Sequence, residues 1–359
     1  MFGRTGNVAG HVEPMAASIC AIFFAAGLAL TGCSPCQKTN STACDTDGTA
    51  CAALAQAAMP PSRATNEFTV LTLNLHQYVS MNRDENPETF EPKPAEETKP
   101  LIDSLRALSP DLLVVQEMGS PEDWAEFKAA LAGGANEPYA YDAYLRRDPE
   151  DRNMALLSRF PIQACQLHTN DLYTIGPRRF PVRRGFLDVT VLARGQTPFR
   201  LLAAHLKSKK FHDFGQAEMR RNEARLLCNH VRDAMAETPA VPLLVIGDLN
   251  DTPSSAALQE VMNYQGRPLL FDLRPLDRLG DAWTWRGADD DCARLDYALA
   301  NALLLPMAVP EKCFIPSSPA LAIASDHRPI FLTFRTGPVP PAAPDSTPAP
   351  APRVYSMDD

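Results

Sequence analysis

The chain has 359 residues, of which 45% are hydrophobic and 21% are charged, and this composition indicates a globular protein rather than a disordered or fibrous one. The formal net charge of -9 argues against a protein that coats nucleic acid non-specifically, although it allows an enzyme with a local basic groove.

An apolar segment, residues 15–33, lies near the amino terminus. It is short for a transmembrane helix, which needs about 20 apolar residues, and it fits the hydrophobic region of a secretory signal peptide. Its last four residues, Leu30-Thr31-Gly32-Cys33, resemble a bacterial lipobox, whose cysteine is lipidated and becomes the first mature residue. A simple signal peptide or an uncleaved anchor is the alternative.

We therefore expect residues 1–33 to be a lipoprotein signal peptide with lipidation at Cys33. The lipid would anchor the protein to a membrane of the bacterial cell envelope, on the periplasmic or the cell-surface side. Residues 34–66 are rich in Ser, Thr and Ala and predict a flexible tether. Residues 67–336 predict one α/β domain, and the Pro/Ala-rich residues 337–359 predict a disordered tail.

Nine cysteines are present, and seven remain when Cys20 and Cys33 of the signal segment are left out. Disulfides are permitted outside the cytoplasm. Because seven is odd, at least one thiol stays free or pairs with another chain. A metal site in the tether is disfavoured, because no Cys-x-x-Cys pair with matching histidines occurs there.

Short apolar runs recur along the predicted domain, and their length and β-branched content are typical of strands. In chain order they are FTVLTLNL, DLLVVQE, ALLS, GFLDVTVL, FRLLAAHL, LLVIGDLN, RLDYALA and RPIFLTF.

Three helices are expected between these strands. The first is predicted to open at Pro100. The second is predicted to begin at Ser120, which is an N-cap with a capping-box acid three residues later, and to end at Gly133. The third, within residues 215–238, is amphipathic, with Ala224, Leu227 and Val231 predicted inward and Arg220, Arg221 and Arg225 outward.

Polar residues with reactive side chains stand at the ends of most predicted strands. Burying one such group without a partner costs a few kcal/mol. The presence of several such residues is explained if their side chains converge on one another and on a cation. The set comprises Asn74, Glu117, His205, Asp248, Asn250, Asp296, Asp326 and His327.

Taken singly, each residue has a plain structural explanation. Glu117 could end its strand in solvent, and His205 could be a hydrogen-bonded core histidine. Asp296 could form half of a structural ion pair, and Asp326 with His327 could form a turn before an edge strand. All of these explanations would have to hold at once, in this order, which favours the convergent interpretation.

The set is carried, in order, by LNLHQY, VVQEM, AHLKSKK, GDLND, RLDYAL and SDHRPI. These motifs resemble those of the endonuclease/exonuclease/phosphatase superfamily, the metal-dependent phosphoesterases related to DNase I. MALLSRFPI also resembles the family's third strand, and the resemblance spans residues 67–336. The acid that members often carry two residues after the first-strand asparagine is His76 here. The resemblance implies a four-layered α/β sandwich, with two packed mixed β-sheets flanked by helices.

Phosphate-ester hydrolysis needs a cation, an activated water and a donor for the leaving oxygen. Glu117, Asp326 and Asn74 are the expected metal ligands. An oxygen-rich, cysteine-free set suits Mg²⁺, or Mn²⁺ or Ca²⁺, rather than Zn²⁺. His327 is the expected general base, because the pKa of histidine lies near neutral pH, and Asp296 would hold its tautomer.

The resemblance adds further roles. His205 is expected to stabilise the transition state as a donor, and Asp248 to position the water or bind metal. Asn74 and Asn250 are expected to hold the phosphate or the nucleophile. The basic segments RRFPVRRGF and HLKSKK flank strands that enter the site, and Arg184 and Lys207 are the expected phosphate contacts.

The leading hypothesis is therefore a metal-dependent phosphodiesterase of the cell envelope, a monomer whose substrate is nucleic acid, because HLKSKK resembles the segment of extracellular nucleases. One alternative is a phosphoesterase of the same fold that acts on phospholipid, inositol phosphate or nucleotide. The other is a non-catalytic module that binds polyanions. The fold alone does not decide among them.

Overall fold

The computed structural model describes residues 62–82, 90–133, 138–148 and 151–337. The predicted signal segment with Cys33, most of the tether and nearly all of the predicted tail lie outside these residues. Among the described residues, no helix has the length and apolar character that crossing a membrane requires.

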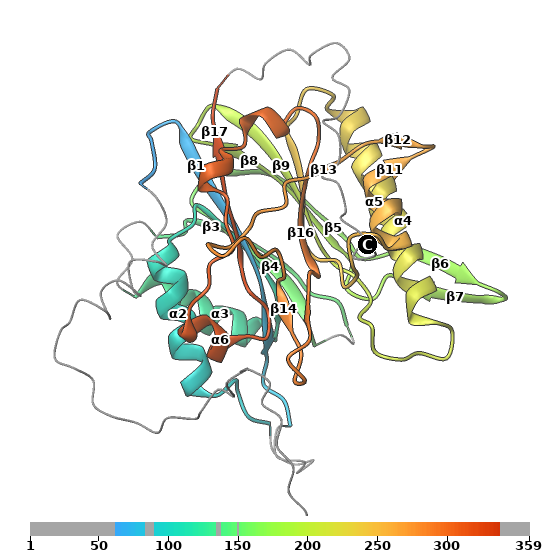
Figure 1. Cartoon of the computed structure of the whole chain (residues 1–359), viewed down its shortest axis with the longest axis horizontal. Helices are drawn as coiled ribbons and strands as arrows, with labels where there is room; N and C mark the ends of the chain where they lie inside the picture. Colours follow the sequence, from blue (N-terminus) through green and yellow to red (C-terminus); the bar gives the residue numbers. More distant parts are fainter. Residues whose placement is uncertain (1–61, 83–89, 134–137, 149–150, 338–359) are drawn as a thin grey trace, which may run out of the picture. The chain divides into compact units, whose positions relative to one another are not determined.

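Two mixed β-sheets make up most of the domain (Figure 1). The first has the strand order β17-β1-β2-β4-β3, and the second has the order β13-β16-β10-β9-β8-β5. The strands of the first sheet are β17 (Ile330–Arg335), β1 (Glu67–Tyr78), β2 (Leu112–Met118), β4 (Asn153–Ser158) and β3 (Tyr141–Leu145). Those of the second are β13 (Phe271–Asp272), β16 (Asp296–Ala300), β10 (Leu243–Asp248), β9 (Thr197–His205), β8 (Phe186–Ala193) and β5 (Ile162–His168).

Helices cover the outer face of each sheet. The first sheet carries α2 (Ala95–Leu108), α3 (Pro121–Ala132) and α6 (Pro319–Ala324), and the second carries α4 (Gln216–Glu237) and α5 (Ala256–Met262). Figure 1 shows the two helix groups on opposite sides of the sheets. The order helices, sheet, sheet, helices confirms the predicted four-layered α/β sandwich.

Apolar side chains fill the space between the layers. In β1, Phe68 and Val70 face the core between the two sheets, while Leu71 and Leu73 face the helices of the first sheet. A strand buried on both faces has a continuous apolar sequence rather than an alternating one. This burial explains why all eight predicted apolar runs form strands.

Several short strands were not predicted. They form the two-stranded pairs β6 (Leu172–Ile175) with β7 (Arg178–Pro181), β11 (Asn263–Tyr264) with β12 (Arg267–Pro268), and β14 (Trp285–Arg286) with β15 (Cys292–Ala293). The edge strands β3 and β5 were not predicted either, and no residue of β5 is buried. A strand of mixed polarity at a sheet edge lacks the apolar pattern that reveals the central strands.

Two helix predictions need correction. Helix α2 begins at Ala95, so that Pro100 lies inside it rather than at its start. Leu101, Leu105 and Leu108 form an apolar stripe that packs against the first sheet. This packing stabilises the helix despite the proline in its interior. Arg220 of α4, predicted to face outward, is buried, and its Nε donates to Asp251 Oδ2 over 2.8 Å.

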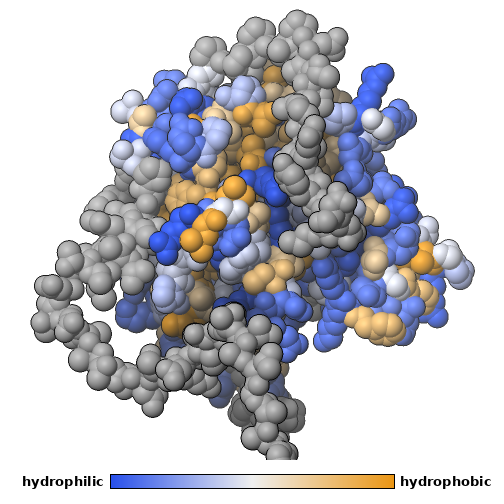
Figure 2. Space-filling model, viewed as in Figure 1, coloured by the Kyte–Doolittle hydropathy of each residue, from blue (hydrophilic) through white to orange (hydrophobic). Residues whose placement is uncertain are grey.

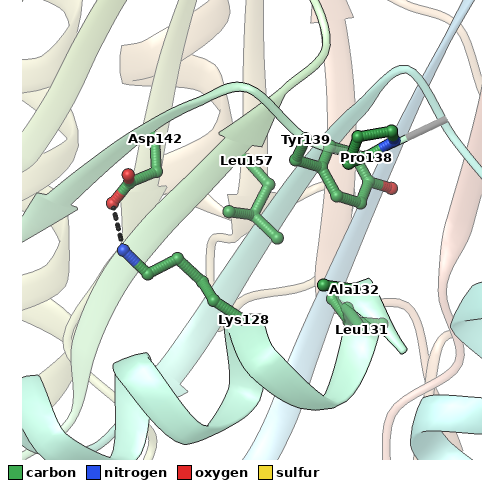
Figure 3. Close-up of a pocket in the computed structure, with 7 residues that line it drawn as sticks. All are labelled: Lys128, Leu131, Ala132, Pro138, Tyr139, Asp142 and Leu157. Atoms are coloured by element: carbon green, nitrogen blue, oxygen red, sulfur yellow. Dashed lines mark hydrogen bonds and ion pairs between the residues drawn. The ribbon is translucent and has the colours of Figure 1, made fainter. Parts of the chain in front are cut away.

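The capping box of α3 is confirmed. The backbone N–H of Asp123 donates to Ser120 Oγ over 3.1 Å, and the backbone N–H of Ser120 donates to Asp123 Oδ2 over 2.7 Å. Where this helix meets the sheet, a small cavity of about 50 Å³ remains, and Lys128 and Asp142 form an ion pair of 3.0 Å on one side of it (Figure 3). This cavity contains none of the predicted site residues.

Most of the surface seen in Figure 2 is hydrophilic, with apolar residues gathered in patches between the polar ones.

The cysteines of the described residues, Cys165, Cys228, Cys292 and Cys313, are all free thiols.

Candidate active site

A polar cleft of about 220 Å³ lies where strands of both sheets end. Strands β1 and β2 are parallel, as are β9 and β10, so that each pair brings two carboxyl ends to the same edge. The cleft is lined by Asn74, His76, Gln77, Glu117, His205, Ser208, Asp248, Asn250, Trp285, Asp326 and His327. Seven of the eight predicted strand-end residues therefore line this cleft. The eighth, Asp296, does not line the cleft but contacts His327.

Asp248 lies at the centre of the buried polar groups. Its Oδ2 accepts from Asn74 Nδ2 and from Asn250 Nδ2, each over 3.1 Å, and its Oδ1 accepts from the backbone N–H of Asn250 over 2.9 Å. Burial and the nearby Asp296 carboxylate raise the pKa of Asp248. The two asparagines thus fix the carboxylate in one orientation.

His327 is paired with Asp296. The ring nitrogen Nδ1 lies 2.8 Å from Asp296 Oδ2, while Nε2 points toward Asp248 and lies 4.0 Å from its Oδ2. Burial lowers the pKa of His327, but the charge and hydrogen bond of Asp296 outweigh this effect and raise the pKa to about 10. Asp296 thereby sets the tautomer and leaves Nε2 facing the cleft.

His205 lies at the end of β9, with Nε2 3.3 Å from Asp248 Oδ2. Its other nitrogen, Nδ1, is buried and has no partner among the described residues. Burial, followed by the positive charges of Arg184 and His327, holds the pKa of His205 well below its usual range. At neutral pH this imidazole is uncharged.

Glu117 is directed into the cleft by a break in the sheet. The register between β1 and β2 shifts after Asn74, and both Gln77 and Glu117 have positive φ, of 61° and 60°. Bulges beside active sites often redirect a side chain in this way. The backbone N–H of Gln77 donates to Glu117 Oε2 over 2.9 Å, and Arg152 Nε lies 3.7 Å from the same oxygen.

Asp326 also lines the cleft. Its Oδ2 accepts from the indole Nε1 of Trp285 over 3.0 Å, and its Oδ1 lies 3.8 Å from His76 Nδ1. Together with Asn74 and Glu117 it gives the cleft an oxygen-rich, cysteine-free donor set, which fits a hard divalent cation such as Mg²⁺.

Arg184 and Lys207 lie beside the cleft without lining it. Arg184 Nη1 donates to the backbone oxygen of Leu206 over 3.1 Å, and this oxygen also accepts from Asn250 Nδ2 over 3.1 Å. Lys207 Nζ donates to the backbone oxygens of Ser208 and Lys210. Both cations are therefore held by carbonyl groups, and their contact with phosphate stays a prediction.

Sequence reasoning missed Trp285, Ser208 and Thr284. The hydroxyl of Thr284 accepts from the backbone N–H groups of Leu295 and Asp296, each over 3.0 Å, and fixes the start of β16. Trp285 and Thr284 lie in a connection that carries no long apolar run. The aromatic pair in DAWTWRG was the only signal that could have pointed to them.

A family model described as "Endonuclease/Exonuclease/phosphatase family" matches residues 72–327. Among solved structures, an endonuclease/exonuclease/phosphatase from Beutenbergia cavernae is similar, with 21% identity and a TM-score of 0.56 over 77% of this chain and 73% of that one. The human Nocturnin catalytic domain has 16% identity and a TM-score of 0.53, over 75% of this chain and 94% of that one. Sphingomyelinase C from Streptomyces griseocarneus has 18% identity and a TM-score of 0.51, over 75% and 99%. No curated protein matches the chain.

Proposed function

The chain belongs to the endonuclease/exonuclease/phosphatase family, and from this premise we propose that it is a divalent-metal-dependent phosphodiesterase that hydrolyses nucleic acid. Members of the family are generally hydrolases of phosphoester bonds. The observation that carries the proposal is the single cleft that holds the His327–Asp296 pair, the fixed Asp248 carboxylate and the oxygen donors Glu117 and Asp326.

Glu117, Asp326 and Asn74 would hold the cation, which neutralises phosphoryl oxygens and activates water when bound. The protein groups then have distinct tasks. His327 Nε2 takes a proton from the attacking water, and Asp296 stabilises the imidazolium that results. The raised pKa of His327 favours the protonated ring, and a cation held by Asp326 would lower this pKa and so favour the form that accepts a proton.

Asp248 orients the water through Oδ2, the oxygen that faces His327. Hydrogen bonds from Asn74 and Asn250 hold the Asp248 carboxylate in place. The neutral His205 donates a hydrogen bond to the charge that develops on the phosphoryl group. A preorganised donor in a site with little water typically contributes more to the rate than the same donor in solution.

An exposed basic segment supports nucleic acid as the substrate. Lys209 and Lys210 are exposed and directly follow Ser208, which lines the cleft. Arg178 and Arg179 are exposed on the hairpin of β6 and β7. In a chain with a formal net charge of -9, the two exposed lysines next to the cleft would attract a polyanion to that place.

A groove lined by both apolar and charged residues supports a phospholipid as the second candidate substrate. It measures about 910 Å³ and shares His76, Trp285 and Asp326 with the cleft. Leu279 and Ile323, which line it, are 77% and 58% exposed, and such side chains suit an apolar leaving group.

One assay separates these substrates. Supercoiled and linear DNA, RNA, an aryl phosphodiester and phospholipid vesicles are offered side by side, each with Mg²⁺ and with EDTA. We expect EDTA-sensitive cleavage of nucleic acid, lost in Asp248→Asn and retained in Asp233→Asn, a control on the exposed side of α4. Turnover of vesicles alone would favour the phospholipid, and cation binding without any turnover would contradict the enzyme proposal.

We also propose that Cys33 is lipidated and tethers the domain to the cell envelope. The support is the sequence Leu30-Thr31-Gly32-Cys33 after an apolar segment. In a bacterial host, the full-length protein is expected in the membrane fraction, and Cys33→Ala is expected to lose lipid labelling. Equal labelling of both proteins would contradict the anchor.

A further inference from the structure

A second cluster of metal-binding side chains lies outside the catalytic cleft. His168 is the last residue of β5, Asp171 stands between β5 and β6, and His230 belongs to α4. Each offers one donor atom, and the three donor atoms lie within 4.8 Å of one another. None of the three residues lines the cleft.

The cluster is compact and mostly enclosed. His230 Nε2 lies 2.8 Å from Asp171 Oδ2, and the rings of His168 and His230 have their centroids 3.8 Å apart. The side chains of His168, His230 and Asp171 are 11%, 18% and 21% exposed. One side of the cluster thus remains open to solvent, as in zinc sites that keep water as a fourth ligand.

His168 lacks a strong partner. Its buried Nε2 lies 3.5 Å from Asp188 Oδ2, which is long for a hydrogen bond. That carboxylate already accepts from Arg200 Nε and Nη2 over 2.9 and 2.7 Å. With Nε2–H turned toward Asp188, Nδ1 keeps its lone pair for coordination. A carboxylate behind a metal-binding histidine is the usual arrangement.

A hydrogen-bonded histidine pair without a metal explains only part of this geometry. It accounts for the contact between His230 and Asp171 but gives no role to the second imidazole, which stacks on the first and has Asp188 Oδ2 3.5 Å from its Nε2. Two imidazoles and one carboxylate from three separate elements are, in contrast, a common ligand set for a transition ion.

We propose that His168, Asp171 and His230 bind a divalent transition ion, of which Zn²⁺ is the best match. The backbone oxygen of Asp171 accepts from the N–H of Val182 over 2.9 Å, at the base of the hairpin formed by β6 and β7. The ion would therefore join this hairpin to α4. The proposal does not depend on the catalytic activity.

Cobalt(II) provides the test, because a four-coordinate Co²⁺ site absorbs visible light strongly. The protein is titrated with Co²⁺ in excess Mg²⁺, which would compete with Co²⁺ for the oxygen-rich cleft. We expect one tetrahedral site that Zn²⁺ displaces, and binding weakened by about 100-fold or more in His168→Gln and His230→Gln, the upper end of what loss of a supporting partner costs. The matched control is His212→Gln, outside both clusters.

A second readout separates lost binding from lost folding. Zn²⁺ is expected to raise the melting temperature of the wild type and of His212→Gln, but not that of His230→Gln or Asp171→Asn. The last variant keeps the shape of the side chain and removes its charge. No strong Co²⁺ absorption in the wild type, or equal Co²⁺ affinity in all variants, would overturn the proposal.

Discussion

At the residue scale, the proposed chemistry of the cleft depends on the pairing of His327 with Asp296. The imidazole is oriented by a 2.8 Å contact on one side and faces Asp248 on the other. An isolated histidine would titrate near pH 6.5, whereas this one has its pKa raised to about 10 chiefly because Asp296 opposes the effect of burial. Asp296 thus controls the pH range in which His327 accepts protons.

The first prediction concerns this control. Replacing the carboxylate in Asp296→Asn removes the main cause that raises the pKa of His327, so that the pKa falls. In the proposed mechanism the unprotonated imidazole is the active form, so that the acidic limb of the pH profile of kcat/KM moves to lower pH. The maximal rate falls by roughly 10²- to 10⁴-fold, because the tautomer is no longer fixed. An unshifted limb in a folded variant would contradict the pairing.

The convergence of the site residues could be predicted from the sequence, but the direction of individual side chains could not. Asp248 and Asn250 follow a buried strand, and parallel strands end at the same edge. The long side chains of Arg184 and Lys207 can turn either way, and here backbone carbonyls bind them. Trp285 begins the two-residue strand β14, which is too short to show an apolar pattern in the sequence.

At the element scale, the close approach of β9 and β10 positions Asp248. Gly247 has a φ of 129°, and a Cβ there would lie 2.2 Å from the backbone oxygen of Ala204. No side chain can be accommodated without moving one of the two strands. Apolar runs predicted these strands, because both faces of each are buried, but this close contact depends on the register between them.

The second prediction follows from that contact. Gly247→Ala is expected to lower the free energy of unfolding by about 3 kcal/mol, through strain at an unusual φ and displacement of a strand. It should also reduce turnover, since Asp248 follows directly. Urea unfolding measures the first effect. The control Gly266→Ala lies at a position with positive φ but nothing within 4 Å, and it should cost less. Equal losses in the two variants would show that the close contact is unimportant.

At the scale of the whole molecule, charge is unevenly distributed. The formal net charge is -9, yet Lys209 and Lys210 are exposed directly after Ser208 of the cleft. The average composition argues against a protein that coats nucleic acid non-specifically, but only the fold places these cations beside the proposed catalytic groups.

The third prediction tests this arrangement. In the double variant Lys209→Ala, Lys210→Ala, the KM for DNA should rise several-fold while kcat changes little, and the dependence of KM on salt should become weaker, because fewer counterions are released. Hydrolysis of a small aryl phosphodiester serves as the control and should be unaffected. An equal loss of activity on both substrates would contradict a role limited to the polyanion.

The most direct test of the catalytic cleft is the rate of hydrolysis of an aryl phosphodiester by wild type and His327→Gln, measured with Mg²⁺ and with EDTA. We predict Mg²⁺-dependent hydrolysis by the wild type and a rate lower by roughly 10²- to 10⁴-fold in the variant, measured at a temperature at which a cooperative unfolding transition shows that the variant is still folded. Equal rates in the two proteins, or hydrolysis that EDTA does not affect, would contradict the proposal that this cleft is a metal-dependent active site.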